Sequence, residues 1–300
     1  MRRRGWVKIL IGGLAVVLAL VVGVALGGLV WVNSSLQRLP VSLPGSKAVW
    51  LVVGVDDRAA ADEEILEDTG TGEPGARADV LLLARAEGGT LRLLSVDRRV
   101  VALDASGTPA RLGASWLEGP QRTVDLFCQG LGVGVGHVVQ VDFAGLVEVV
   151  DALGGIEIRL DHALRDGPAH LELGAGVQRV DGRTALALVR SRQGELLVDG
   201  QWQPETRGAE GRQHRAGTVL TQVVHAMRQA GPGRAWEAAD VARRRLAVDP
   251  GTGVLDVLSL RDLELVPEVL VTEPVAEEDL MTGIEPEGQQ QLDVFRDGSC

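Results

Sequence analysis

The hydrophobic pattern of the chain starts with one long uninterrupted run. Residues 9–32 carry no charged side chain. As a helix, at about 1.5 Å per residue, this run would extend about 36 Å, enough to cross the hydrocarbon core of a bilayer. Trp6 and Trp31 stand near its two ends, and indole rings favour the membrane interface. The pattern predicts one transmembrane helix.

Charge around this run predicts its orientation. Residues 1–8 hold basic side chains and no acid, so the positive-inside rule makes them a cytoplasmic tail. The alternative is a cleaved signal peptide, whose apolar part usually has about 7–15 residues. The run is longer than that, which favours an uncleaved anchor. We therefore expect a single-pass protein of the cell membrane, with everything after the anchor outside the cytoplasm.

Strand patterns follow the anchor. Residues 33–47 are polar and contain two prolines, which predicts a short stalk. Residues 48–55, AVWLVVGV, are typical of a buried strand. Residues 79–86 and 90–96 are two more apolar runs, and the Gly-Gly pair between them indicates a hairpin.

Apolar residues recur at helical spacing further along, and Asp142 and Asp181 are suited to cap two of these segments. Because strands and helices alternate, we predict an α/β (mixed α+β) fold, a central mixed sheet flanked by helices. The helices are expected over residues 120–131, 143–153, 182–190, 212–230 and 235–246, with further strands over 138–141 and 156–160.

Composition narrows the class of protein. The 300 residues are 45% hydrophobic and 24% charged, which fits a packed domain. The net charge is −11, and since the N-terminal tail is basic, the remainder is more acidic still. A duplex-binding protein needs a basic face, so we expect no nucleic-acid partner.

Two cysteines are too few for a disulfide framework. Cys128 lies in an apolar helical pattern and is expected to be a small core residue. Cys300 ends the sequence and is expected to be mobile. A bridge between them is the less favoured alternative.

Carboxylates stand at predicted strand ends, while common nucleotide, zinc and serine-hydrolase motifs are missing from the sequence. Asp56 follows the first strand and Asp79 opens the second. Mg²⁺ is often held by one or two carboxylates together with substrate phosphates. Spacing alone leaves a metal site and a solvated acidic loop equally open.

Arginines gather at other junctions. Arg190 and Arg192 end a predicted helix, Arg212 and Arg215 share a helix face, and Arg98 follows a strand. Guanidinium groups bind phosphate oxygens in a bidentate manner. The alternative, which composition alone favours, is solvated surface charge.

Taken together, five segments in register resemble the LytR-CpsA-Psr family of bacterial cell-envelope proteins, in its actinobacterial form. The resemblance covers residues 48–230, and the tail, residues 231–300, resembles the C-terminal extension of the same domain with a flexible end. The segments are LVVGVDDR (51–58), RADVLLLARAEGGTLRLLSVDRR (77–99), the stretch 118–158 with VDFAGL and VDALGG, VDGRTALALVRSRQ (180–193) and DGQWQPETRGAEGRQHRA (199–216).

The resemblance implies a sheet and helices that enclose a hydrophobic groove for a polyprenyl chain. It implies a phosphotransferase that moves a glycopolymer from a polyprenyl-pyrophosphate carrier to peptidoglycan, with Mg²⁺ or Mn²⁺ at the groove mouth. By position, the metal side would be Asp56 and Asp79, the catalytic group Arg98, Arg190, Arg192 and Glu210, and the phosphate-binding group Arg58, Arg77, Arg212 and Arg215.

The sequence departs from the family pattern at several of these positions. The family's S-I-P-R-D becomes Ser95–Arg99, SVDRR, so its final acid is Arg99. An acid expected at 209 is Ala209, although Glu210 is adjacent. The family's K-I-N-A becomes RLGA, with Gly113 in place of Asn. The acid lost at 209 would have been the candidate base for the acceptor hydroxyl.

Two hypotheses follow from these departures. In the first, the protein is a working transferase that uses Glu210, another acid, or arginines and metal alone. In the second, it is a non-catalytic relative that binds polyprenyl phosphates or a partner protein at the cytoplasmic membrane during envelope assembly or regulation.

Overall fold

The computed structural model describes residues 28, 30–56, 77–191, 193–205, 208–274 and 281–300. Most of the predicted anchor lies outside these residues. None of the helices in the described ranges is long and apolar enough to span a membrane.

A mixed sheet forms the centre of the molecule, as predicted. Its seven strands run in the order β1-β14-β7-β2-β3-β4-β15, with parallel pairs at β1–β14, β2–β7 and β4–β15 and antiparallel pairs elsewhere. The strands are β1 (Gln37–Arg38), β2 (Ser46–Asp56), β3 (Arg77–Glu87), β4 (Thr90–Val96), β7 (Val135–Asp142), β14 (Leu246–Val248) and β15 (Glu264–Val269).

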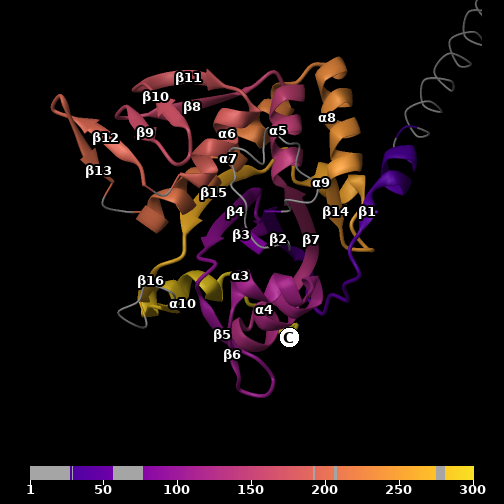
Figure 1. The fold of residues 1–300 in the computed structure, drawn as a ribbon. Helices are drawn as coiled ribbons and strands as arrows, with labels where there is room; N and C mark the ends of the chain where they lie inside the picture. The colour runs from indigo at the N-terminus through magenta and orange to yellow at the C-terminus, as the bar shows by residue number, and fades with distance from the viewer. Residues whose placement is uncertain (1–27, 29, 57–76, 192, 206–207, 275–280) are drawn as a thin grey trace, which may run out of the picture.

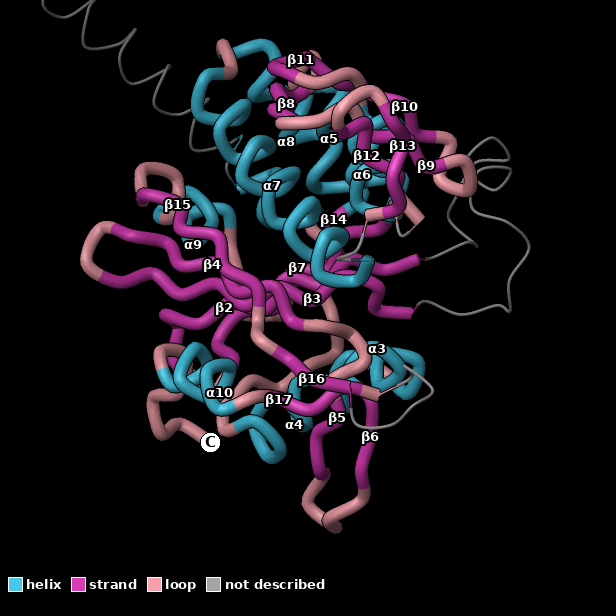
Figure 2. The backbone as a smooth tube through the Cα atoms, turned by 90° about the vertical axis from the view of Figure 1, so that its left-hand side faces the viewer, coloured by secondary structure: helices cyan, strands magenta, loops and turns pink. Residues whose placement is uncertain are grey.

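Helices cover both faces of this sheet (Figures 1 and 2). On one face, odd-numbered β2 residues such as Leu51 and Val53 pack with Phe127 and Leu292 in the largest apolar core. The helices on this face are α3 (Leu112–Ser115), α4 (Pro120–Leu131) and α10 (Pro286–Asp293), and those on the other face are α5 (Phe143–Ala152), α6 (Gly182–Arg190), α7 (Gly208–Gln229), α8 (Pro232–Arg245) and α9 (Val254–Ser259).

Short strands complete the fold outside the main sheet. A hairpin follows β4, and two small sheets lie over α5, α6 and α7 on the far side from the main sheet (Figure 1). These elements are β5 (Val101–Leu103), β6 (Pro109–Arg111), the 3₁₀ turn η1 (Trp116–Glu118), β8 (Ile156–Leu160), β9 (Leu164–Asp166), β10 (Leu171–Leu173), β11 (Gly176–Val180), β12 (Glu195–Val198), β13 (Gln201–Pro204), β16 (Thr272–Pro274) and β17 (Thr282–Ile284).

Local signals in the sequence set the helix ends. The side chains of Asp142 and Asp181 accept hydrogen bonds from the N–H groups of Gly145 and Thr184, so both are N-caps as predicted. Helix α4 begins at a proline and ends at Gly132, whose φ of 69° only glycine adopts readily.

Two features differ from the sequence-based expectations. Cys128 on α4 forms a disulfide with Cys300, so the expectation of an unpaired core cysteine and a mobile C-terminus is wrong. Residues 33–47 include β1, which pairs with β14 across more than 200 positions of the chain. Both contacts are long-range, and local composition carries no signal for either.

Candidate functional site at the ends of β2, β3 and α6

The carboxylates expected at strand ends lie on adjacent strands of the main sheet. β2 ends at Asp56, which is paired in register with Arg77 on β3. Two residues further along β3, Asp79 is the extra residue of a bulge in the β2–β3 ladder. A bulge bends its strand and redirects the extra side chain. The bulge therefore explains why Asp79 leaves the alternation of its strand.

Asp79 meets Arg98, which follows the neighbouring strand β4. Nη1 of Arg98 donates to Oδ1 of Asp79, and both side chains are partly buried. The N–H of Gly113 donates to the carbonyl of Arg98 at 2.8 Å. A Cβ on Gly113 would lie only 2.7 Å from the Cβ of Arg98. Helix α3 is thus pressed against Arg98 and holds its backbone in place.

Arg99 turns away from this pair toward Asp97. Its Nη2 donates to Oδ2 of Asp97 at 2.8 Å, and its backbone N–H donates to Oδ1 at 2.8 Å. Asp97 is only 1% exposed. The acid that the family carries at 99 is absent here, but an acid two residues earlier neutralises the arginine that replaces it.

A second charged group lies where α6 ends and α7 begins. Arg190, half-buried, is the last residue of α6. Arg215 on α7 is buried and donates to the carbonyls of Leu188 at 3.3 Å and Ser191 at 2.8 Å. It also donates from Nη1 to both oxygens of Glu205, at 2.9 and 2.8 Å. Arg215 therefore ties the end of α6 to the segment that leads into α7.

Asp166 holds the same segment from the other side. This carboxylate, 1% exposed, accepts from the hydroxyl of Ser191 at 2.8 Å and from the N–H of Gln193 at 2.9 Å. It also accepts from the N–H of Ala169 at 3.1 Å. Since Ser191 and Gln193 flank position 192, Asp166 fixes the backbone on both sides of Arg192.

An apolar layer joins the two charged groups. Val80, the residue after Asp79, packs against the cluster that contains Leu188 of α6 and Ala216 of α7. Val52 and Val80 belong to central strands under a layer of helices, yet both remain only partly buried. Residues next in sequence to Asp79, Arg190 and Arg215 thus belong to one apolar cluster between the sheet and the helices.

The structure describes part of the predicted site. Arg58 and Arg192 lie outside the described residues, as do the side chains of Glu210 and Arg212. Sequence reasoning missed three acids in this region, Asp97, Asp166 and Glu205. Asp97 lies two residues before its partner Arg99 and could have been found from the sequence. The other two contact residues at least ten positions away, which no local motif reveals.

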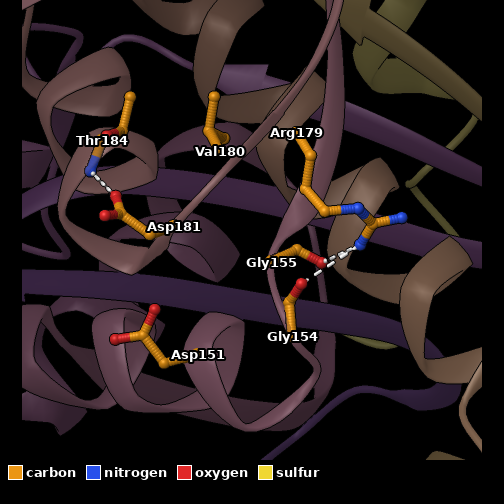
Figure 3. A pocket seen from close by; sticks show the side chains of 7 residues that line it. All are labelled: Asp151, Gly154, Gly155, Arg179, Val180, Asp181 and Thr184. Carbon is orange, nitrogen blue, oxygen red and sulfur yellow. Dashed lines mark hydrogen bonds between the residues drawn. The ribbon is translucent and has the colours of Figure 1, made fainter.

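A surface pocket of about 490 Å³ lies at the opposite end of α6 (Figure 3). Its polar groups bind one another: Asp181 caps α6, Asp151 accepts from the N–H of Gly182 at 2.8 Å, and Arg179 donates to the carbonyls of Gly154 and Gly155. Hydrogen bonds from Thr184, first from its side chain and then from its backbone N–H, lower the pKa of Asp181. This pocket is therefore separate from the charged groups described above.

The side chains that could ligate a metal ion limit which kind of metal site this region can form. Among the described residues, no three His, Cys, Asp or Glu side chains gather as a metal cluster. Asp56 and Asp79, on adjacent strands, fit the weaker requirement of Mg²⁺, which is held by one or two carboxylates when substrate phosphates complete its shell.

The chain is similar to known cell-wall proteins. It is 31% identical over 199 residues to the probable cell wall biosynthesis protein LcpB of Corynebacterium glutamicum, covering 63% of this chain and 47% of that protein. It therefore spans about half the length of that relative. It is 25% identical to the polyisoprenyl-teichoic acid–peptidoglycan teichoic acid transferase TagT of Bacillus subtilis, covering 68% of this chain and 69% of TagT.

Solved structures share the fold. The LytR-Csp2A-Psr enzyme from Actinomyces oris superposes with a TM-score of 0.71 at 28% identity, covering 87% of this chain and 96% of that one. The model of the LytR_cpsA_psr family matches residues 35–263, which include both charged groups. With its actinobacterial relatives, the chain belongs to the LytR-CpsA-Psr family.

Proposed function

We propose that this protein transfers a cell-wall glycopolymer from a polyprenyl-pyrophosphate carrier to peptidoglycan, at the outer surface of the cytoplasmic membrane. The observation that carries the proposal is the Arg98–Asp79 pair, which is followed along β3 by Val80, a residue packed against the apolar cluster of α6 and α7. A lipid pyrophosphate needs both features, cations for its phosphates and an apolar surface for its chain.

The charged residues have separate roles in this proposal. Arg98 and Arg190 would bind the phosphates, together with Arg58, Arg77, Arg192 and Arg212. Arg215 is buried against Glu205 and the end of α6, so we assign it to positioning rather than to direct phosphate contact. Phosphoryl transfer depends chiefly on positioning and charge neutralisation. Arginines that bind the phosphates, together with one that positions the backbone, could supply both.

The transfer step forms one bond and breaks one. An acceptor hydroxyl oxygen attacks the phosphorus that carries the glycopolymer, the P–O bond to the bridging oxygen breaks, and polyprenyl phosphate leaves with that oxygen. The hydroxyl proton passes to a base, for which Glu210 is the candidate in this chain. A divalent cation held by Asp56 and Asp79 would neutralise charge on the phosphates.

The disulfide supports the location outside the cytoplasm. Cys128 and Cys300 are paired, and disulfides persist in oxidising compartments such as the cell surface. The uncharged run and the basic tail before it give the same orientation.

The direct test uses the full chain in detergent with a polyprenyl-pyrophosphate saccharide, Mg²⁺ and peptidoglycan, and measures released polyprenyl phosphate. Arg98→Ala should lower the rate at least tenfold. Arg92→Ala is the matched control, since Arg92 lies on β4, the strand that precedes Arg98, and forms an exposed ion pair with Glu268. Equal rates for the two variants would contradict the proposed role of Arg98.

A second function, binding without catalysis, is favoured by one specific observation. Arg98, Arg99 and Arg215 each form an ion pair with an acid of the chain, and position 209 carries alanine. Tight binding of polyprenyl phosphate without turnover, with turnover gained in Ala209→Asp, would support this reading. Mass spectrometry of copurified lipid tests binding directly.

A further inference from the structure

A cluster of exposed apolar side chains surrounds the point where the predicted anchor joins the folded domain. We call Val30, Trp31, Trp236, Leu255 and Leu258 the tryptophan patch. All five are exposed, from 42% at Trp31 to 70% at Leu255. They come from the first described helix, from α8 and from α9, and Figure 1 shows that first helix beside α8.

Direct contacts hold the patch together. The rings of Trp31 and Trp236 stack at 5.9 Å between centroids, with 15° between their planes. The guanidinium of Arg243 lies 4.2 Å from the centre of the Trp31 ring. The N–H of Val254, which opens α9, donates to the side chain of Asn33 at 3.4 Å. Residues at the end of the uncharged run are therefore packed on α8 and α9.

The segment after the patch is also fixed to the domain. Arg38 donates to the carbonyls of Asp249 at 3.0 Å, Thr252 at 2.5 Å and Asn33 at 3.0 Å. Gln37 donates to the carbonyl of Arg244 at 2.6 Å, and both residues form β1. A stalk would leave the domain free to move relative to the anchor, but these bonds remove that freedom.

We propose that the tryptophan patch docks on the lipid bilayer and lies in its interfacial region. The inference rests on the proposed membrane anchoring. If residues 9–32 span the bilayer, Trp31 lies where the helix leaves it, and the ring of Trp236 lies at the same level because the two rings stack. Tryptophan is enriched at this depth because its ring is amphipathic.

Charge indicates which lipids the patch needs. The three arginines that end α8 share two acids: Arg243 and Arg244 pair with Asp240, and Arg244 and Arg245 pair with Glu148. The hydrogen bond from Arg243 lowers the pKa of Asp240, which keeps this acid charged. These three arginines and two acids leave one unit of net positive charge at this end of α8. Docking should therefore occur on zwitterionic phosphatidylcholine and not require anionic lipid.

The experiment uses the full chain in phosphatidylcholine vesicles and measures the depth of single spin labels. Both native cysteines are paired, so one introduced cysteine is the only free thiol. Labels at Ala235→Cys and Leu255→Cys report on the patch and leave both tryptophans in place. Leu103→Cys is the control, since Leu103 is 54% exposed and β5 lies on the far side of the sheet (Figure 2).

Each spin label collides with oxygen, which concentrates in the bilayer, and with a nickel complex, which stays in water. We expect the ratio of the first collision rate to the second to be several-fold higher for labels at 235 and 255 than for the label at 103. Trp236→Ser should bring the ratio at both patch positions toward the control value without releasing the protein from the vesicles. Values at 235 and 255 equal to that at 103, in protein that floats with the vesicles, would overturn the docking but leave the anchoring intact.

Two other outcomes would also count against the inference. If the chain does not float with the vesicles, the anchoring itself fails, and the docking with it. If the label at 235 shows spin–spin broadening that disappears on dilution with unlabelled protein, the patch is covered by a second copy of the chain and not by lipid.

Discussion

The guanidinium of Arg99 contacts the carboxylate of Asp97, two residues earlier, with Nη2 at 2.8 Å from Oδ2. Asp97 is nearly fully buried, while the Arg99 side chain is 20% exposed. The pair balances its own charge, so Asp97 offsets the arginine that stands in place of the family's acid at 99.

From this pair we predict that an acid at position 99 destabilises the protein unless Asp97 is replaced as well. Arg99→Asp takes the Arg99 guanidinium from the buried Asp97 and places a second carboxylate nearby, which should lower the free energy of unfolding by about 3 kcal/mol. In the double variant with Asp97→Asn, at least half of that loss should be recovered. Urea unfolding measures both values, and equal losses in the single and double variants would show that the pair is not coupled.

Asp166 is predicted to act on the site through the backbone at 191–193. Asp166→Ala removes the acceptor of three hydrogen bonds, so amide exchange at residues 191–194 should speed up and polyprenyl phosphate release should fall at least tenfold. Asp161→Ala, an exposed acid in the preceding turn, is the control. A tenfold loss of activity with unchanged exchange would exclude a positioning role.

His137 predicts how stability depends on pH. Its ring is buried, stacks on Trp50 at 4.1 Å and contacts the Thr252 hydroxyl through Nδ1 at 2.5 Å. Burial lowers the pKa of His137 below the usual 6.5. The charge of Lys47 lowers it further, while the charges of Asp249 and Asp256 raise it without cancelling the effect of burial. Below about pH 6.5, the unfolded chain therefore binds a proton that the folded chain resists, and stability falls as the pH falls.

Chemical denaturation between pH 7.5 and 5 tests this sign. The free energy of unfolding should decrease over that interval in the wild type and decrease less in His137→Phe, which keeps an aromatic ring against Trp50. His162→Gln, at an exposed position, should behave like the wild type. A wild type that becomes more stable as the pH falls would contradict the neutral buried histidine.

The disulfide predicts a large stability difference between oxidised and reduced protein. Cys128 and Cys300 are 172 positions apart, and the loop-entropy model assigns a loop of this length up to about 5 kcal/mol. The Cys128→Ser/Cys300→Ser variant should lose part of this stabilisation, so that its free energy of unfolding falls. It should also show faster amide exchange near residue 295. Reductant should bring the wild type to the same stability and leave the variant unchanged.

The sequence predicted those parts of the fold that depend on neighbouring residues. The Gly-Gly hairpin after β3 and the Asp caps of α5 and α6 are local, and the structure confirms them. The pairing of Cys128 with Cys300 and the addition of β1 to the sheet depend on contacts between distant segments. Local patterns cannot specify such contacts, because many pairings satisfy the same pattern.

The candidate site divides in the same way. Motif positions identified Arg98 and Asp79, and the structure shows their contact. The motifs did not show that Arg215 forms an ion pair with Glu205, or that Asp166 accepts hydrogen bonds from the residues on either side of position 192. Which arginines face a ligand and which hold the protein together is decided by tertiary packing, so residue type alone could not separate them.

The close approach of Gly113 to Arg98 limits which residues positions 97, 99 and 113 accept. A side chain at 113 would meet the Cβ of Arg98 at 2.7 Å and the carbonyl of Ala78 at 2.8 Å, so the asparagine of the family pattern cannot return unless the backbone at 98 moves. That backbone continues into the turn that Asp97 and Arg99 close. Changing 97, 99 or 113 alone to the residue of the family pattern is therefore expected to be more costly than changing the three together.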